Sequence, residues 1–364
     1  MSFLDISALS RDELLELANI ETPELRQKSV KKLLVTGKDL HKLRPEEVRR
    51  IEPLSIWQDL FCMCCFAFGV PGAAFTIPVV LLCVAYVVSS TLAISLFAML
   101  IPLAFVPARF KESNLYSWAS VMMIKYFSFK VIFHDFIPAK TRTILVAPPH
   151  GVFPFGNIIT MLGFPSVMGY PFNGIASNAV FRTPIFRQIL EWIDVMDASR
   201  ATCERILNAD GIIGISTGGV AEVFETDASM DAGDECVVLK SRKGLVKLAL
   251  RTGADITPCY LFGHTKLLSC FTGGIAHAPL KALSRAIGFA TILFWGRFLL
   301  PIPYRVPILG VLTAPIKVKK VPAGTEPTQK QIDDIHAELL ARMHALFEEY
   351  KHLYGWQDKK LVIK

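Results

Sequence analysis

Hydrophobic and polar positions divide the chain into three regions. Charged residues are frequent over residues 1–58, a long apolar run follows, and from residue 109 onwards short apolar segments alternate with amphipathic ones. The 49 residues from Leu60 to Ala108 contain no Asp, Glu, Lys, Arg or His. Because a helix needs about 20 apolar residues to cross a bilayer, this run is long enough for two spans and a turn. The pattern therefore predicts a two-helix transmembrane hairpin over residues 59–108.

The residues within and around the apolar run indicate how the hairpin is arranged. Its turn is expected at Ser89-Ser90-Thr91, which divides the run more evenly than the alternative at Pro71-Gly72. Residues 25–50 carry nine Lys or Arg against three acidic residues, and further basic residues follow the run from Arg109 onwards. Since basic residues stay on the cytosolic side of a membrane, both ends of the hairpin are expected in the cytosol. Residues 1–58 are too many and too charged for a cleaved signal peptide.

From residue 109 the alternation is typical of an α/β domain with a sheet flanked by helices. Strands are predicted at residues 143–147, 211–216, 236–239 and 256–262. Helices are predicted at residues 200–209, capped by Ser199, and at residues 243–251, ended by Gly253. Apolar residues at spacings of three and four define one face of a long terminal helix: Ile332, Ile335, Leu339, Met343, Leu346 and Tyr350.

Three regions with different roles are therefore expected. Residues 1–58 form an N-terminal cytosolic region that is basic and helical, residues 59–108 form the hairpin, and residues 109–364 form a cytosol-facing α/β domain. Within that domain, residues 286–305 are apolar but too few between charges to span a membrane. They are either a core element or a part that enters the membrane interface.

Composition excludes several classes of protein. With 52% hydrophobic and 20% charged residues, the chain has too much apolar surface for a mainly disordered protein. Eight cysteines in 364 residues are too few for a disulfide scaffold, and none has zinc-ligand spacing near histidines, so no metal site is expected. The net charge of +7 is modest, and no nucleic-acid partner is expected.

Candidate chemistry lies after the predicted strands, because sites in open α/β sheets form at the carboxyl ends of strands. The first predicted strand is followed by Pro148-Pro149-His150-Gly151. Histidine is the side chain best suited to move a proton near neutral pH, and the prolines and the glycine fix the backbone around it. An isolated histidine is more often a surface loop residue, but this rigid position favours a catalytic role for His150.

Two further strand ends add charged groups. The second strand is followed by Gly218-Gly219 and by Glu222, whose carboxylate is expected to hold the imidazole of His150 in one tautomer. The alternative is a glutamate that only complements a helix dipole. The third strand is followed by Arg242 and Lys243 at a helix start. Two cations beside free backbone N–H groups favour a phosphate site, although a solvated basic turn would have the same sequence.

These blocks, in this order, resemble the diacylglycerol acyltransferase type 2 group of the lysophospholipid acyltransferase superfamily. His150-Gly151 is similar to the end of the His-Pro-His-Gly signature of that group, and residues 218–222 are similar to its Gly-Gly-x-x-Glu. Further blocks in register are residues 177–181, 242–250 with 253–255, 260–263, 303–305 and 327–329. The resemblance extends from the hairpin to the C-terminus and implies an acyltransferase-type mixed sheet flanked by helices.

The resemblance implies an O-acyltransferase that moves a fatty acyl group from acyl-CoA to the free hydroxyl of diacylglycerol, giving triacylglycerol and CoA. Its partners would be acyl-CoA, diacylglycerol and the lipid bilayer, and a homo-oligomer is left open. No metal or redox cofactor is needed for acyl transfer, so acyl-CoA is expected only as a co-substrate. The expected location is the endoplasmic reticulum membrane, with two crossings and both termini cytosolic, and lipid droplets are a second candidate location.

The resemblance also implies roles for single residues. His150 would be the general base on the acceptor hydroxyl, and Glu222 its partner carboxylate. Backbone N–H groups would stabilise the oxyanion, and three side chains would hold the CoA phosphates. The backbone groups are those of Gly151, Gly218 and Gly219, and the side chains are those of Arg242, Lys243 and Arg182.

Three positions depart from the family pattern. Pro148 stands in place of the first histidine of the signature, so His150 alone remains to transfer the proton. Phe155 stands where the wider superfamily has an Asp five residues after its histidine, which is why Glu222 is the expected partner. His264 stands where a family glutamate is expected, and its role is left open.

Three alternatives accompany this interpretation. Monoacylglycerol and wax-alcohol acyltransferases share these motifs, so the acceptor stays open. A serine lipid hydrolase would use Ser216, in Gly214-x-Ser216-x-Gly218, with Asp255 and His264 or His277 in the right chain order. No oxyanion-loop motif precedes that serine, which favours a chance match. A non-enzymatic hairpin protein that coats lipid droplets would give no reason for the long α/β region.

Overall fold

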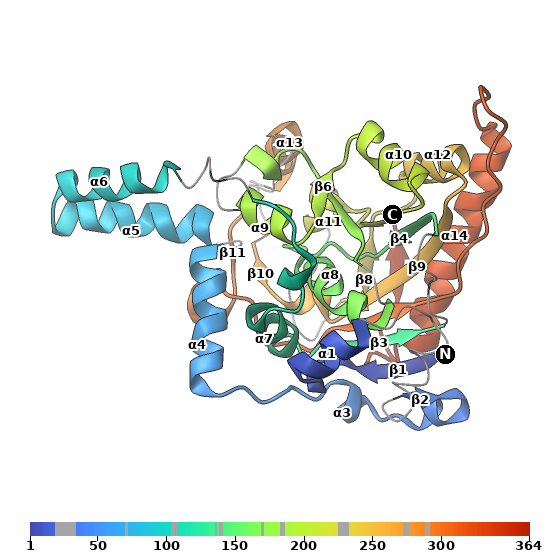
Figure 1. Ribbon diagram of the computed structural model, residues 1–364, viewed down its shortest axis with the longest axis horizontal. Coiled ribbons are helices and arrows are strands. Elements are labelled where there is room, and N and C mark those ends of the chain that lie inside the picture. Colours follow the sequence, from blue (N-terminus) through green and yellow to red (C-terminus); the bar gives the residue numbers. More distant parts are fainter. Residues whose placement is uncertain are drawn as a thin grey trace.

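A large mixed sheet forms the centre of the molecule in the computed structural model (Figure 1). The structure describes residues 1–18, 34–69, 72–102, 106, 108–134, 137, 141–168, 171–182, 186–224, 233–271, 277–287 and 292–364. Nine strands of these residues make up the sheet, in the order β2-β1-β3-β12-β9-β4-β7-β5-β6. Their bounds are β1 Ser2–Asp5, β2 Val35–Thr36, β3 Lys130–Phe133, β4 Thr143–Val146, β5 Asn173–Ala176, β6 Val195–Asp197, β7 Ile212–Ile215, β9 Asp255–Phe262 and β12 Leu309–Leu312.

The half of the sheet that carries the predicted strands is parallel. Strand β4 pairs in parallel with both β7 and β9, and β5 lies in parallel between β7 and β6. Strand β12 runs antiparallel to β9 and parallel to β3. The predicted mixed sheet flanked by helices is therefore confirmed. The predicted strand at residues 236–239 corresponds to β8, Glu235–Val237, which pairs with β13, Leu361–Ile363, outside the large sheet.

Helices cover both faces of the sheet. Successive side chains of β4 pack alternately against the helices of one face and of the other. Leu145 packs against one apolar cluster, with residues of α7, Trp118–Tyr126, and α8, Phe155–Met168. Ile144 and Val146 point to the opposite face, into a cluster with α10, α12 and α14. The bounds of these three helices are Arg200–Asn208, Gly244–Thr252 and Gln329–Tyr350. This period of two is what a strand buried on both faces requires.

The start of α10 and the end of α12 follow the predicted signals. The Ser199 hydroxyl accepts a hydrogen bond from the backbone N–H of Thr202 at the start of α10. Gly253, which ends α12, has the left-handed backbone that favours glycine at this position. Thr328 and Gln331 form a capping box at the start of α14, and the predicted apolar face of α14 is turned to the core.

The apolar run from Leu60 to Ala108 forms a pair of helices, but the prediction that they span a membrane is not confirmed. Helix α5, Ala73–Val87, and helix α6, Ser90–Leu100, lie side by side and project from the body (Figure 1). Among the described residues, no helix is both long enough and apolar enough to cross a bilayer. The physical reason is their length: 15 and 11 residues fall short of the roughly 20 that a span requires. The turn is placed correctly, because the Ser89 hydroxyl caps α6.

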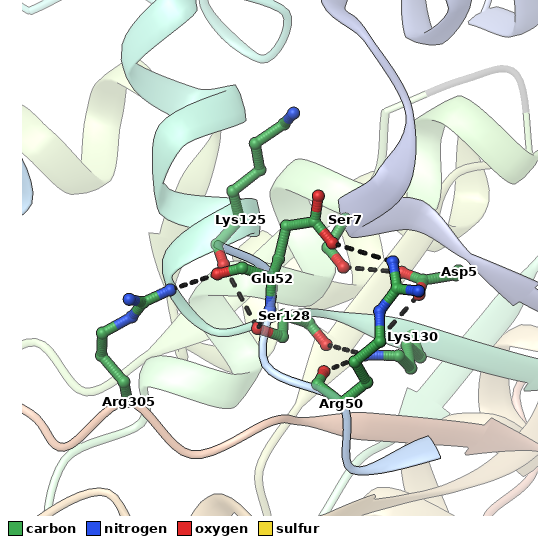
Figure 2. A network of polar contacts seen from close by, with 8 residues as sticks. All are labelled: Asp5, Ser7, Arg50, Glu52, Lys125, Ser128, Lys130 and Arg305. Atoms are coloured by element: carbon green, nitrogen blue, oxygen red, sulfur yellow. Dashed lines mark hydrogen bonds and ion pairs between the residues drawn. The ribbon is translucent and has the colours of Figure 1, made fainter. Parts of the chain in front are cut away.

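The N-terminal region is attached to the α/β body rather than separate from it. Strand β1 pairs antiparallel with β3, so residues 2–5 belong to the large sheet. Lys130, which is only 1% exposed, donates from Nζ to the carbonyls of Arg50 at 2.8 Å and Ser128 at 3.1 Å and lies 3.7 Å from Asp5 (Figure 2). Arg305 donates to the carbonyl of Glu52 in the same network. One buried cation thus joins two segments of the N-terminal region to β3.

The remaining elements surround this core. The helices are α1 Arg11–Ala18, α3 Pro45–Val48, α4 Ile56–Cys64, α9 Phe186–Trp192, α11 Gly219–Val223 and α13 His277–Ile287. A further two-stranded sheet pairs β10, Ser269–Cys270, with β11, Phe294–Trp295. The short helical turn η8, Arg297–Leu299, leaves Phe298 71% and Leu299 81% exposed. Within the segment 286–305, the turn η8 is therefore not a core element.

Candidate active site

Two loops that the sequence analysis singled out meet at one edge of the sheet. Strands β4 and β7 are parallel neighbours with Val146 opposite Ile215, and the backbone N–H of Ala147 donates to the carbonyl of Ile215 at 2.9 Å. Both strands therefore end at the same level, and the residues that follow them are side by side. The structure in this way brings His150 and Glu222 together.

The imidazole of His150 is held by the backbone of the next residue, Gly151. Nδ1 lies 3.0 Å from the carbonyl oxygen of Gly151, whose φ of +60° turns this carbonyl toward the ring in a conformation that favours glycine. Because a carbonyl only accepts, Nδ1 carries the proton in this hydrogen bond and Nε2 keeps its lone pair. Burial lowers the pKa of His150 below its ordinary value, so the ring is neutral near pH 7. A neutral ring with a free Nε2 is the form that a general base requires.

Glu222 contacts His150 in a different way from the one predicted. Its carboxylate is fully buried, and Oε2 accepts a hydrogen bond from the backbone N–H of His150 rather than from the ring. Oε1 accepts from the backbone N–H of Val238 at 2.9 Å. The expectation that Glu222 fixes the ring tautomer is therefore corrected: the Gly151 carbonyl does so. Burial raises the pKa of Glu222 to about 7.

Gly218 allows Glu222 to reach the histidine loop. A Cβ atom on Gly218 would lie 2.2 Å from the carboxyl group of Glu222, closer than any side chain permits. Gly218 and Gly219 both line the cavity next to His150, where α11 begins. The first N–H groups of a helix have no partner within the helix, which is the property expected of oxyanion donors.

The three predicted phosphate ligands are not brought together. Arg242 lines the cavity, and its Nη2 donates to the carbonyl of Gly218 at 3.2 Å. Lys243 turns to the surface and pairs with Asp333 at 2.6 Å. Arg182 is exposed at the end of a short helical turn, and neither Lys243 nor Arg182 lines the cavity. Of the three, only Arg242 is placed beside the candidate base.

His150 opens onto a cavity of about 950 Å³ with a mainly apolar lining. The cavity extends from the carboxyl edge of β4 and β7 along α8 to residues 174–176 of β5 and Val195 of β6. Large apolar side chains in its lining include Leu145, Val152, Phe153, Ile158, Met161, Phe164, Phe172, Ile175, Val180, Phe186, Leu190, Val195, Ile215, Val223, Ile292 and Phe294. A cavity of this size and lining suits a long hydrocarbon chain.

His264 is a site residue whose role the sequence did not assign. It follows β9, is 1% exposed, and its ring lies against the backbone of Gly151 and Gly156. Nε2 lies 3.0 Å from the carbonyl oxygen of Phe153 and 3.2 Å from the backbone nitrogen of Gly156. Burial lowers the pKa of His264 to about 4, so it stays neutral. Its position in the sequence could have indicated this role. His264 follows β9, which is parallel to β4, so both strands lead to the same edge of the sheet, where the ring of His264 packs against the loop that carries His150.

The alternative serine triad is not assembled. Asp255 begins β9 opposite Thr143, whereas Ser216 comes after the end of β7, so about four residues or 13 Å along the strands separate them. Asp255 is instead paired with Lys317 at 2.6 Å. The side chain of His277 lies outside the described residues, and His264 is held by the His150 loop. No group of three or more His, Cys, Asp or Glu is placed to hold a metal in the part of the chain that the structure describes.

Comparisons with known proteins show which family the chain belongs to. Residues 88–364 match the family model of diacylglycerol acyltransferase. "Diacylglycerol O-acyltransferase 2" of Danio rerio is 32% identical over 263 residues, covering 66% of this chain and 70% of the relative. The mouse protein of that name is 32% identical over 259 residues, covering 63% and 64%. Human "2-acylglycerol O-acyltransferase 3" is 28% identical over 247 residues, covering 63% and 70%.

Among solved structures, the 1-acyl-sn-glycerophosphate acyltransferase PlsC of Thermotoga maritima is similar at 14% identity. The match covers 69% of this chain and 88% of that one with a TM-score of 0.36. The family model alone covers well over half of the chain, including the His150 loop, Glu222 and the cavity. The chain belongs to the diacylglycerol acyltransferase family.

Proposed function

We propose that this protein is an acyl-CoA:diacylglycerol O-acyltransferase, which forms triacylglycerol and CoA. The observation that carries the proposal is a neutral His150 with a free Nε2 on the wall of an apolar cavity of about 950 Å³. The relatives named for diacylglycerol are the more similar ones, at 32% identity against 28% for the relative named for 2-acylglycerol. Neither the comparisons nor the geometry favours a monoacylglycerol, a wax-alcohol or a hydrolytic activity.

The reaction follows from the position of His150. Nε2 takes the proton of the acceptor hydroxyl while the hydroxyl oxygen forms a bond to the thioester carbonyl carbon. The tetrahedral intermediate then collapses, the carbon–sulfur bond breaks, and the imidazolium returns the proton to the CoA sulfur. The products are the new ester and the free thiol, and His150 is neutral again. These proton transfers and bond changes require no metal ion and no redox cofactor.

Backbone amides and one arginine are the proposed binding groups. The N–H groups of Gly151, Gly218 and Gly219 would stabilise the oxyanion of the intermediate. Arg242 is the phosphate ligand that the geometry supports, because it lines the cavity. Lys243 and Arg182 would reach the CoA only if their side chains turned from their present positions.

We further propose that the helix pair α5–α6 holds the enzyme at the cytosolic side of the endoplasmic reticulum membrane, with both chain ends in the cytosol. These helices leave large apolar side chains exposed: Val79, Val80, Leu82, Tyr86, Val87, Leu92, Ile94, Phe97 and Met99. Apolar surface of this extent marks a site of contact with lipid or protein. Under this proposal, protease added to intact microsomes removes tags from both ends of the chain, and protection of either tag would contradict it.

The test of the activity offers three acceptors in competition. Microsomes from yeast that lack triacylglycerol synthesis, expressing this chain, receive labelled acyl-CoA with diacylglycerol, monoacylglycerol and a long-chain alcohol. We expect most of the label in triacylglycerol formed directly from diacylglycerol. Label mainly in wax ester or diacylglycerol would assign another acceptor, and label only in free fatty acid would assign a hydrolase.

A further inference from the structure

Four buried polar atoms without a hydrogen-bond partner among the described residues belong to side chains that line the cavity. They are Asn157 Oδ1, Ser216 Oγ, Thr217 Oγ1 and Arg242 Nε, and we refer to these four residues as the polar wall. The remainder of the lining is mainly apolar. Buried polar atoms in folded proteins nearly always have a hydrogen-bond partner. Four such atoms without one, all on the same cavity, therefore indicate that a bound molecule supplies their partners.

A chain of hydrogen bonds places the polar wall beside the catalytic histidine. Asn157 donates from Nδ2 to the carbonyl of Ala147 at 2.7 Å, and Ala147 donates in turn to Ile215 at 2.9 Å. The two hydroxyl residues follow Ile215 directly, and Arg242 donates to the carbonyl of Gly218, the next residue but one after Ser216, at 3.2 Å. The four atoms therefore gather at the carboxyl edge of β4 and β7, where His150 also lies.

The chemistry of the polar wall indicates what it binds. The hydroxyls and the Nε–H can each donate a hydrogen bond to an atom that offers a lone pair, such as a carbonyl oxygen. In 1,2-diacylglycerol the other two glycerol carbons each carry an ester group, one next to the carbon of the reacting hydroxyl and one a carbon further away. When that hydroxyl lies at His150 Nε2, the ester carbonyls come within reach of groups adjacent to His150. A long-chain alcohol brings no such carbonyl.

We propose that Ser216 and Thr217 bind the ester carbonyls of the acceptor and so make this site prefer an acceptor that carries esters. The inference rests on the proposed function and adds to it the atoms that select the substrate. It also gives Ser216 a role as a hydrogen-bond donor, in place of the nucleophile considered from the sequence.

The experiment compares an ester acceptor with its ether counterpart. Purified full-length enzyme in mixed micelles is given oleoyl-CoA and either 1,2-dioleoylglycerol or 1,2-di-O-oleylglycerol, and kcat/KM is measured for each. The ether keeps the hydroxyl, the shape and the chains but lacks both carbonyls. One or two hydrogen bonds correspond to a preference of about threefold to tenfold for the ester in the wild type. Ser216→Ala and Thr217→Val should each lower this ratio, and the double variant should bring it close to one.

Two variants serve as matched controls. Thr217→Ser keeps the hydroxyl and should keep the wild-type ratio. Thr257 is also a buried threonine whose hydroxyl has no partner among the described residues, but it lies on β9 and does not line the cavity. Thr257→Val should therefore leave the ester-to-ether ratio as in the wild type. If Thr217→Val does not fold, Ser216→Ala, which removes one small hydroxyl, carries the test.

Several results would overturn the inference. A wild-type ratio of one, or variants that lower kcat/KM equally for both acceptors, would show that the hydroxyls do not bind the ester carbonyls. Loss of all turnover in Ser216→Ala with either acceptor would restore the nucleophile role. Failure of the proposed function would give a different result from failure of this inference, because the wild type would then transfer no acyl group to either acceptor.

Discussion

At the scale of single residues, the site depends on how backbone groups hold one imidazole. The sequence correctly placed His150 and Glu222 near each other but assigned the wrong contact between them. The carbonyl of Gly151 sets the tautomer of the ring, and Glu222 holds the backbone of the loop from behind. The motifs predict that His150 and Glu222 lie close together. Whether the carboxylate accepts from the ring N–H or from the backbone N–H depends on the exact loop conformation, which residue spacing does not predict.

Substitution of Gly218 tests the contact with Glu222. In Gly218→Ala the new Cβ would collide with the Glu222 carboxyl group, so the loop that carries His150 must move. We expect the rate of acyl transfer to fall on the order of 100-fold, since a shift of about 1 Å in a catalytic group has this effect. Gly244→Ala is the matched control, because Gly244 also begins a helix and a Cβ there meets open space. Equal activity of the two variants would contradict this role of Gly218.

The buried carboxyl of Glu222 predicts a dependence of stability on pH. Its pKa is raised from 4.5 in the unfolded chain to about 7 in the folded protein, mainly by burial. The folded state therefore binds more protons than the unfolded state between these values, and the free energy of unfolding falls as pH rises from 4.5 to about 7.

Comparison of the wild type with Glu222→Gln isolates this effect. Gln cannot ionise, so the decrease with pH should be smaller in the variant, as measured by urea unfolding at several pH values. Parallel stability curves for the two proteins over this range would show that Glu222 does not change its protonation there.

At the scale of elements, the sequence predicted best what depends on local signals. The caps of α10 and α12 and the strands β4, β7 and β9 follow from side chains within a few residues. Strands β1, β5 and β12 were missed because each contains at most one β-branched residue, whereas β4 and β7, of the same length, contain three each. The lengths of α5 and α6 were not predicted for a related reason, because an absence of charge indicates apolarity and not where a helix begins and ends.

An ion pair attaches the base of the helix pair to the α/β body. Arg297, on η8, donates to both carboxylate oxygens of Asp59, on α4, at 2.7 and 2.8 Å. These hydrogen bonds lower the pKa of Asp59, and both side chains are only about a fifth exposed. The contact fixes α4 against the segment that carries the exposed Phe298 and Leu299.

Loss of this ion pair should destabilise the protein. Asp59→Asn should lower the free energy of unfolding by about 1–3 kcal/mol, because a partly buried guanidinium loses its charged partner. Asp39→Asn removes the exposed pair with Lys42 and should cause no measurable change. Thermal unfolding of the two variants in the same detergent compares them directly. Equal midpoints for Asp59→Asn and the wild type would contradict a stabilising role.

At the scale of the whole molecule, the N-terminal region and the α/β domain share one sheet and one buried network. The regions predicted from composition divide the chain by charge, but β1 and the segment around Arg50 are held by Lys130 of β3 (Figure 2). Burial lowers the pKa of Lys130, and its three polar contacts offset that cost. No pattern in the sequence indicated these contacts, because two of the three partners are backbone carbonyls.

Removal of the buried ammonium should loosen the N-terminal region. Lys130→Met leaves the carbonyls of Arg50 and Ser128 without this donor, so we expect a loss of about 1–3 kcal/mol in stability and faster proteolysis before residue 52. Lys125→Met is the control, because the Lys125 ammonium points away from the network (Figure 2). Limited proteolysis followed by mass spectrometry distinguishes the two. Unchanged cleavage in Lys130→Met would show that the other contacts of β1 suffice.

The central claim is that His150 is the general base of acyl transfer from acyl-CoA to diacylglycerol. Its most direct test is the kcat of purified His150→Ala with oleoyl-CoA and 1,2-dioleoylglycerol, beside His344→Ala, an exposed histidine of α14. General-base catalysis predicts a loss of about 100- to 10,000-fold for His150→Ala, with the thermal unfolding midpoint retained, and no loss for His344→Ala. A folded His150→Ala enzyme that turns over at the wild-type rate would contradict the claim.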